Sequence, residues 1–431
     1  MRLVCCVLIL VCSWGWAQQG LTYADIERLT YQAFIDGQYD KVKKIGKEAL
    51  AQNFDYFDLR LRLGIVYFRE QHFDNALLHF EKAHQMNPQD AVLQEFLYFT
   101  YINLGKWQTA KRYIDSLRSE PNFQTSVKLQ NGLQSLYVYT GVIHAQQNVS
   151  AMDVTALYRE QKVQRETYMM GLGALIYTNN RIALMPNLSV FQVGAESSID
   201  FNNQVEQRVF SNTNIQASVR TTYEYSSRMT LGLHTGVFQE KSTSLTSVFT
   251  PFEPVNYVEI PYSHLAMFGQ VFGDFQWRNF KLQSSFGVSN FSNTTQNQWE
   301  ALGYYFPKGN RNLWFLSGLA VVDQLQTQQT LFFGGAGLRL TKAFWAELKG
   351  STGNHLNYLS ADGVGIFNTL DPVLNATSLK MHYQINRWVI SSVLAWQQRE
   401  NTNFVITSDG ISSEKTKFNN YLMSISLSWK N

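Results

Sequence analysis

The sequence predicts an α+β chain of two domains: an N-terminal α-solenoid of three helix–turn–helix repeats, then an antiparallel transmembrane β-barrel of about 14 strands. Three observations predict this. Related segments recur every 34 residues at Gly37–Asp40, Gln71–Asp74 and Gly105–Gln108, and apolar and polar residues alternate across 126–431. Charged residues are only 16% of the chain and aromatic residues 14%, whereas soluble domains carry about 25% charged residues. That composition suits a sheet with one face in lipid and one in water.

Residues 1–17 have the pattern of a secretory signal peptide. Arg2 supplies the positive charge, Leu3–Cys12 the apolar core, and Gly15–Ala17 a small-residue cleavage site. The core is shorter than the about 20 apolar residues that a membrane-spanning helix needs. All three cysteines lie inside this segment. We therefore expect the mature protein to contain no disulfide, no thiolate nucleophile and no cysteine metal ligand.

The 34-residue period is that of the tetratricopeptide repeat, and the N-terminal segments resemble this family. The middle repeat, about 57–90, matches the pattern best, at Leu63, Gly64, Tyr67, Ala76, Phe80, Ala83 and Pro88. Small residues there let paired helices approach, aromatic residues fill the gaps, and Pro88 ends the second helix. Repeats at about 23–56 and 91–122 are in register with it. The resemblance implies a tetratricopeptide domain over 18–125, with about the minimum number of units for stability.

In such arrays the inward positions of each first helix line a concave groove. By register these are Tyr31, Phe34, Ile65, Phe68, Phe99 and Ile102. An apolar groove of this kind suits the amphipathic helix or extended peptide of a periplasmic or outer-membrane protein. The alternative is that residues 123–134, or another loop of the same chain, fill the groove.

The strand pattern continues to the C-terminus. In the last strand Met423, Ile425 and Leu427 share one face, and Ser424 and Ser426 share the other. A soluble sandwich would also alternate, so the connections and the aromatic residues decide between the two. A closed cylinder is expected because lipid cannot satisfy the backbone groups of an open sheet edge.

Short turns alternate with longer polar loops, as they do between the two rims of an outer-membrane barrel. The short turns are at 178–180, 226–228, 308–310, 341–342 and 386–387, and the long loops are near 147–163, 195–208, 242–258, 290–298, 355–374 and 400–415. Aromatic residues gather at strand ends, as in an interfacial ring: Tyr177, Tyr223, Tyr225, Phe275, Trp277, Phe280, Phe344, Trp345, Trp388 and Trp429. We therefore expect a barrel over 126–431 in contact with outer-membrane lipid.

No catalytic motif, cofactor-binding loop or metal-ligand set stands out in the sequence, so we predict a protein that is not an enzyme. The glycine-rich runs at 171–173 and 334–337 lack the following Lys-Ser/Thr of a phosphate loop. Glycines that ease strand curvature explain them better. A net charge of +3 predicts no attraction to nucleic acid.

Charged side chains on the inward faces of the strands are the remaining candidates for a site. The predicted lumen-lining residues are Arg220, Glu224, His234, Lys281, Glu347, Lys349, Lys380 and His382. They either set the selectivity of a water-filled lumen or pair with one another and fill the interior. The turn-rich stretch 355–374 is either a lid that contacts a ligand or a surface loop.

A signal peptide, tetratricopeptide repeats and a C-terminal barrel together resemble the repeat-plus-barrel export porins of Gram-negative envelopes, which carry cellulose and poly-N-acetylglucosamine. The resemblance implies an outer-membrane barrel with a periplasmic helical domain. Three repeats instead of a long array argue against polysaccharide export in particular. Our leading hypothesis from sequence is a non-enzymatic outer-membrane barrel whose repeats recruit or brace a partner protein in export or secretion across the outer membrane. The alternative is a passive or gated porin for a solute or polysaccharide.

Overall fold

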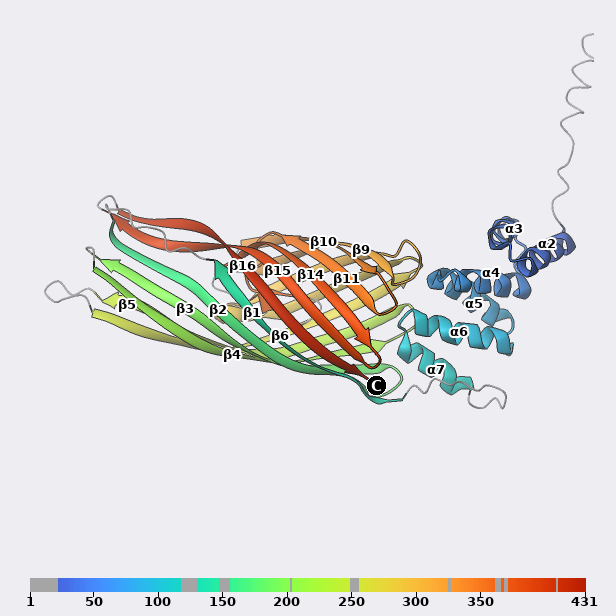
Figure 1. Ribbon diagram of the computed structural model, residues 1–431, viewed down its shortest axis with the longest axis horizontal. Coiled ribbons are helices and arrows are strands. Elements are labelled where there is room, and N and C mark those ends of the chain that lie inside the picture. Colours follow the sequence, from blue (N-terminus) through green and yellow to red (C-terminus); the bar gives the residue numbers. More distant parts are fainter. Residues whose placement is uncertain are drawn as a thin grey trace, which may run out of the picture. The chain divides into compact units, whose positions relative to one another are not determined.

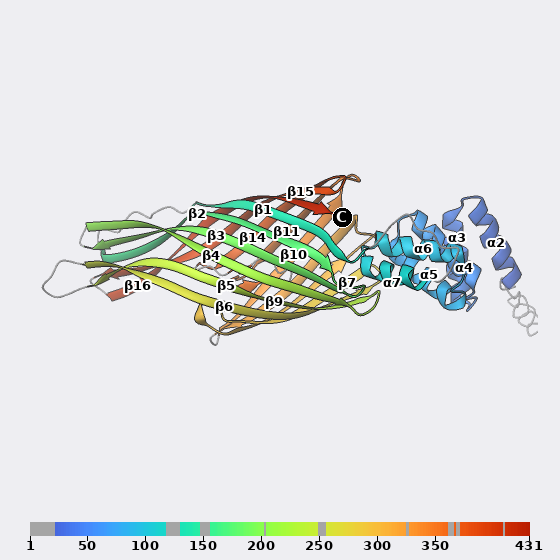
Figure 2. The same cartoon turned by 90° about the horizontal axis from the view of Figure 1, so that it is seen from below.

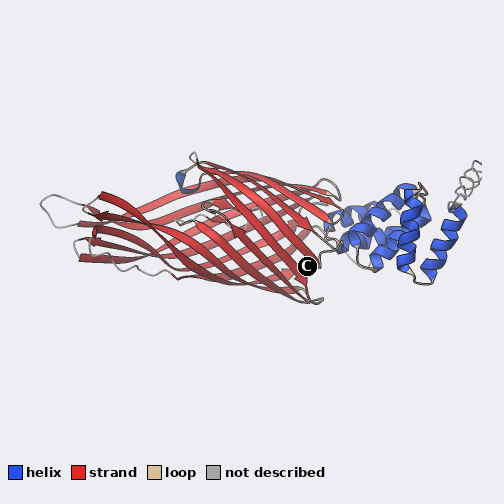
Figure 3. Ribbon diagram, turned by 90° about the horizontal axis from the view of Figure 1, so that it is seen from above, coloured by secondary structure: helices blue, strands red, loops and turns tan. Residues whose placement is uncertain are grey.

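The chain forms two compact units, the first ending at Gly105 and the second running from Lys106 to Asn431. The computed structural model describes residues 22–117, 130–146, 156–201, 204–248, 256–324, 327–360, 366–367, 371–407 and 410–431. The predicted signal peptide and the end of the predicted helical domain lie outside these residues, so both boundaries stay predictions. Figure 3 distinguishes the helices from the strands.

Six helices lie among the described residues: Tyr23–Ile35 (α2), Tyr39–Ala51 (α3), Phe57–Arg69 (α4), Phe73–Met86 (α5), Ala91–Asn103 (α6) and Trp107–Leu117 (α7). α2, α4 and α6 begin at residues 23, 57 and 91, and α3, α5 and α7 at 39, 73 and 107, so both series advance by 34 residues. The helices therefore follow the period in the sequence. Their membership of the tetratricopeptide class, in three repeats, stays a prediction. None of the described helices is long and apolar enough to cross a membrane.

Local sequence explains where these helices begin and turn. The Thr22 hydroxyl accepts a hydrogen bond from the Asp25 amide, and the Thr22 amide donates one to the Asp25 carboxylate, both at 3.3 Å. This reciprocal pair satisfies amides that the start of a helix leaves without partners. The turns after α2 and α6 contain Gly37 and Gly105, with φ of +69° and +72°. Glycine adopts that left-handed conformation without steric cost.

A close approach between α4 and α5 depends on Gly64. A methyl group at this position would lie 2.4 Å from the ring of Phe80, which is far inside van der Waals contact. Phe80 is fully buried, as are Leu59 and Leu63 on the same helix as the glycine. The ring therefore occupies the space that a side chain on residue 64 would need, in agreement with the task that the sequence pattern gives both residues.

Fourteen antiparallel strands close into a barrel in which neighbours in sequence are neighbours in space, and β1 pairs with β16 (Figures 1 and 2). The prediction of about 14 strands is confirmed. The strands are Gly132–Gln146 (β1), Ala156–Tyr177 (β2), Ile182–Phe201 (β3), Gln204–Glu224 (β4), Met229–Val248 (β5), Asn256–Trp277 (β6), Phe280–Ser289 (β7), Gln296–Tyr305 (β8), Leu313–Gln324 (β9), Thr327–Arg339 (β10), Phe344–Thr352 (β11), Val373–Ile385 (β14), Trp388–Thr407 (β15) and Gly410–Lys430 (β16).

The outer wall of the barrel is apolar. On β16 the side chains of Met423, Ile425 and Leu427 are 60%, 54% and 40% exposed, and the serines between them take the opposite face. Large apolar side chains with similar exposure occur on the other strands of the barrel. Such a wall is stable in hydrocarbon and not in water. The architecture is therefore that of an outer-membrane barrel.

Seven strands are far longer than a membrane requires. β2 to β6, β15 and β16 have 20–22 residues, about twice the 9–11 that cross a bilayer. Their distal parts run through 195–201, 204–208, 242–248 and 400–407, which the sequence analysis assigns to loops. That assignment is wrong. Both faces of these hairpins are rich in polar residues, which hides the alternation, while a cluster that includes Ile199 and Leu245 packs between them.

Trp345 faces the interior of the barrel and not the outer aromatic ring predicted for it. Its ring stacks on His382, with centroids 4.7 Å apart, and His382 is on an inward position of β14. Successive residues of a strand point to opposite faces, so Phe344 and Trp345 cannot both face lipid.

Replacing Gly64 by alanine should destabilise the helical unit by about 1–3 kcal/mol, because the added methyl group forces the Phe80 ring out of its position. Hydrogen exchange of the α4 and α5 amides in the full-length protein measures this. In a Phe80→Leu background the same substitution should cost less. An equal cost in both backgrounds would show that the ring is not the cause.

Candidate functional site

The concave face of the wall is identified by contacts between strands that are not neighbours. The Tyr139 hydroxyl on β1 lies 2.7 Å from the Ser189 hydroxyl on β3. Lys349 Nζ on β11 lies 5.8 Å from the centroid of the Trp314 ring on β9. Side chains two strands apart meet only on the inside of a curved sheet. These residues, and those that alternate in step with them, therefore face the lumen.

A segment between β11 and β14 lies against this inner face. We call Gly353–Leu359 the lumenal segment. Its last two residues form β12 and pair with β13, Ile366–Phe367. Tyr358 and Leu359 are only 3% and 2% exposed. The segment is thus a packed part of the barrel interior, whereas the sequence left open whether this stretch was a lid or a surface loop.

Three inward side chains of β8 hold the lumenal segment. The amide of Gln298 pairs with both backbone groups of Leu359: its Oε1 accepts from the Leu359 N–H at 3.0 Å, and its Nε2 donates to the Leu359 carbonyl at 2.6 Å. Gln296 Nε2 donates to the carbonyl of Asn357. The Tyr358 hydroxyl donates to Glu300. Because side chains two residues apart share one face of a strand, β8 presents these three groups in a row.

Apolar contacts hold the same segment from two sides. Leu359 packs in a cluster formed by Phe238, Ala266, Phe268 and Phe291, which come from β5, β6 and the turn after β7. Tyr358 packs in a second cluster, with Ala320, Val322 and Leu331 of β9 and β10. The segment therefore contacts β5, β6, β9 and β10. Together with the β8 row, these contacts hold it inside the barrel against one continuous part of the wall.

The start of the segment is fixed to the wall by His355, which is 1% exposed. Its Nδ1 lies 2.7 Å from the Val373 carbonyl, and its Nε2 lies 2.8 Å from the Ser351 hydroxyl. Gly353 has a φ of +122°, and a methyl group there would lie 2.4 Å from the Thr330 carbonyl oxygen. Only glycine fits this turn, which directs the chain away from β11.

Four of the predicted lumen-lining residues lie together on β11 and β14. Glu347 is 3.7 Å from His382 and 3.8 Å from Lys349. Lys380 is directly opposite Glu347 in the strand ladder. This grouping favours the alternative in which inward charges of opposite sign pair. A role in selectivity stays a prediction.

Three other predicted lumen residues also have close neighbours. Lys281 Nζ is 2.9 Å from an Asp274 carboxylate oxygen. The Arg220 guanidinium lies over the ring of Phe272, 3.8 Å from its centroid, a cation–π contact. His234 is 1% exposed and is therefore a packed wall residue. Their part in conduction is likewise a prediction.

Glu224, the eighth, is the last residue of β4 and is bound by α7. Its carboxylate accepts a hydrogen bond from the Thr109 hydroxyl, and Arg112 Nη1 lies 3.4 Å from its other oxygen. The same Arg112 atom donates to the Asn180 carbonyl at 2.6 Å. α7 is therefore joined to one rim of the barrel through Glu224 at the end of β4 and Asn180 in the turn after β2.

The six predicted groove residues do not share one environment. Tyr31 is 55% exposed and has the Arg62 guanidinium 5.6 Å from its ring centroid, whereas Ile65 is only 8% exposed. The others are half-buried: Phe34, Phe68, Phe99 and Ile102. Phe68 packs against Phe73 of the next helix, with centroids 5.3 Å apart. Binding of a partner by this surface stays a prediction.

Sequence reasoning marked the stretch 355–374 but missed its place inside the barrel and the residues that hold it. The one available signal was the alternation Gln296, Gln298, Glu300, three polar inward positions in succession on a strand. Alternation shows which face these side chains take, but not what they bind. Their partners lie some 60 residues away in the chain and join them only when the barrel closes.

No protein-family model matches the sequence, and no curated protein matches it. Among solved structures, the barrel is similar to a Pseudomonas aeruginosa FadL homologue (8% identity, 70% of this chain and 91% of the other, TM-score 0.47). It is also similar to the Ralstonia pickettii toluene transporter TbuX (8%, 70% and 90%, 0.45) and the Pseudomonas putida toluene transporter TodX (7%, 70% and 90%, 0.41). At these identities and scores, the likeness carries no conclusion about what this barrel does.

Replacing Gln298 by alanine should loosen the lumenal segment, because both hydrogen bonds to the Leu359 backbone are lost. At about 0.5–1.5 kcal/mol per bond, amide exchange at Leu359 should accelerate roughly 5- to 150-fold. The matched control is Gln283→Ala, which removes another buried inward amide, on β7. Unchanged exchange at Leu359 in the Gln298 variant would contradict this account of how the segment is held.

Proposed function

We propose that this chain is an outer-membrane channel for small solutes, in which the lumenal segment is a removable constriction. A barrel of about eight strands is filled by its own side chains, and wider barrels have room for ligands or water. The observation that carries the proposal is the pairing of the Gln298 amide with both backbone groups of Leu359. The Gln298 side chain makes the two hydrogen bonds that the backbone of a neighbouring strand would otherwise make. Leu359 is therefore bound to the wall without being part of its backbone hydrogen-bond ladder.

This form of attachment favours release. Each hydrogen bond between the segment and β8 contributes about 1 kcal/mol net, because water in an open lumen would replace it on both sides. Burial of Leu359 adds about 1.5–3 kcal/mol. The backbone hydrogen bonds between the strands of the barrel all stay in place when the segment is released from β8. The closed form is therefore favoured at rest, and opening does not require the barrel to unfold.

Recruitment of a partner by the helices is the leading hypothesis from sequence, and we now rank it second. The six residues expected to form its groove are unequally covered, with Tyr31 exposed and Ile65 buried. They do not present one continuous apolar face. The lumenal segment, by contrast, is held by matched polar and apolar contacts, which is what a gated pore needs.

Ion conductance in planar bilayers tests the proposal. The double variant Gln298→Ala/Tyr358→Ala should give steady currents several-fold larger than those of the wild type, since it removes contacts to β8 and to the β9–β10 cluster. The Gln283→Ala variant should conduct like the wild type. Silence of all three proteins, with correct folding shown by heat-dependent gel migration, would contradict a channel and favour a scaffold or anchor.

A further inference from the structure

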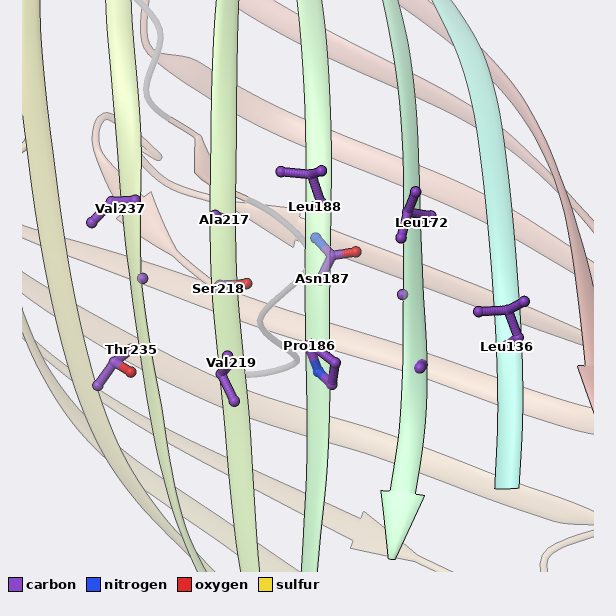
Figure 4. A pocket seen from close by; sticks show the side chains of 13 residues that line it. Leu136, Leu172, Pro186, Asn187, Leu188, Ala217, Ser218, Val219, Thr235 and Val237 are labelled. Carbon is purple, nitrogen blue, oxygen red and sulfur yellow. The ribbon is translucent and has the colours of Figure 1, made fainter. Parts of the chain in front are cut away.

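A hollow of about 440 Å³ lies in the wall formed by β1 to β5 (Figure 4). It spans five neighbouring strands and is separate from the lumenal segment. The lining residues are Leu136, Leu172, Gly173, Ala174, Pro186, Asn187, Leu188, Ala217, Ser218, Val219, Thr235, Gly236 and Val237. No charged side chain is among them. The hollow is thus an apolar site, because the Asn187 and Ser218 side chains lie on the lumenal face with Ser189 and leave Thr235 as its outward polar side chain.

The hollow opens on the outer face of the wall. Its large side chains are outward ones: Leu136, Leu172 and Leu188 are 45%, 50% and 43% exposed. Ala217 lies between Ile215 and Val219 on the outward face of β4. The site therefore faces the membrane and not the lumen.

Two features of the sequence create the hollow. Pro186 has no N–H to give to a ladder, and β2 and β3 are unpaired between Gly173/Asn187 and Ile176/Leu184. Small outward residues, Ala174 and Ala217, stand beside this interruption, where the neighbouring positions carry leucine or valine. The hollow is therefore built into rigid strands and does not depend on a loop.

The position of the hollow in the membrane follows from strand geometry. Val219 and Ala217 precede Tyr223, an outward aromatic residue at the short-turn rim, by four and six residues. At about 3.3 Å per residue and a tilt of about 40°, they lie roughly 10–15 Å above that rim. The apolar band of such barrels is about 25 Å tall. The hollow therefore lies within hydrocarbon, in the half of the band nearer the short turns.

We propose that the hollow binds one acyl chain of a phospholipid from the leaflet nearer the short turns. A spanning helix, about 10 Å wide and 30 Å long, is several times larger than the hollow. Water would have few polar partners there. An acyl chain is flexible and about one methylene wide, so it can bend over the exposed leucines, lie across Ala174 and Ala217, and fill the space. Without an occupant, this space would be a void in the lipid-facing surface. The occupant is thus a structural lipid, held on the outside of the barrel.

Mass spectrometry of the intact full-length protein, released from detergent after purification from membranes, tests this proposal. The wild type should retain one phospholipid per barrel. Ala217→Phe, which fills the middle of the hollow, should lower the retained fraction at least fivefold. The matched control is Ala346→Phe on β11, which adds the same group at an outward alanine far around the wall; it should retain lipid like the wild type.

A second filling variant, Thr235→Leu on β5, guards against a folding defect of Ala217→Phe, and heat-dependent gel migration shows that each variant is folded. Equal lipid retention in wild type and both filling variants would overturn the proposal. So would a wild-type protein that retains no lipid, or one that retains lipopolysaccharide or free fatty acid in place of phospholipid. These outcomes are independent of conductance, so they leave the channel proposal untouched.

Discussion

The structure depends on one constraint: within hydrocarbon, every backbone N–H and C=O group needs a partner from the protein itself. Fourteen strands satisfy it by closing the sheet through β1 and β16. Closure in turn fixes the two faces of every strand, and the apolar side chains of Met423, Ile425 and Leu427 go outward together. The exception on β3 is instructive, because Pro186 removes a donor at a place where small neighbours also leave a hollow.

Closure also produces a strongly curved inner wall, and the interior is organised around it. Residues from strands two apart, such as Tyr139 and Ser189, meet across the curve. The lumenal segment uses what remains of the space, with β8 supplying polar contacts and aromatic clusters supplying apolar ones. His355 ties the segment to β11 and β14, so its base belongs to the wall, while at its described tip, Tyr358–Leu359, the hydrogen bonds with β8 are made by side chains. This difference between base and tip is the physical reason to regard it as a gate.

The helices that precede the barrel, the strand number and the faces of most strands could be predicted from the sequence, because period and alternation are local properties. The 34-residue spacing recurs in the starts of the helices, and the outward face of β16 was readable residue by residue. The distal parts of β2 to β6, β15 and β16 were not predicted as strands, because polar residues on both faces erase the alternation on which strand prediction relies. The prediction for Trp345 was wrong because it considered only that the residue is near a strand end. It did not consider that adjacent residues, such as Phe344 and Trp345, point to opposite faces.

The interior was much harder to predict. Inward charges such as Glu347 and Lys349 could be placed on the inner face, but their neighbours depend on register between strands. The contact of Gln298 with Leu359 joins residues that are about 60 positions apart, and no local pattern encodes it. Sequence likewise could not show that Pro186 and Ala217, on adjacent strands, border one hollow. The proposed function of this chain thus rests on contacts that exist only after closure.

The wall of the barrel has a lipid face and a lumenal face, and labelling of single cysteines along β16 in intact membranes tests this most directly. With the signal peptide removed, the chain is expected to have no other cysteine. A membrane-impermeant, water-soluble maleimide should label cysteines at 424, 426 and 428 and leave those at 423, 425 and 427 unlabelled. Equal labelling of both sets, or labelling of the odd positions alone, would contradict a closed barrel with an outer wall in hydrocarbon.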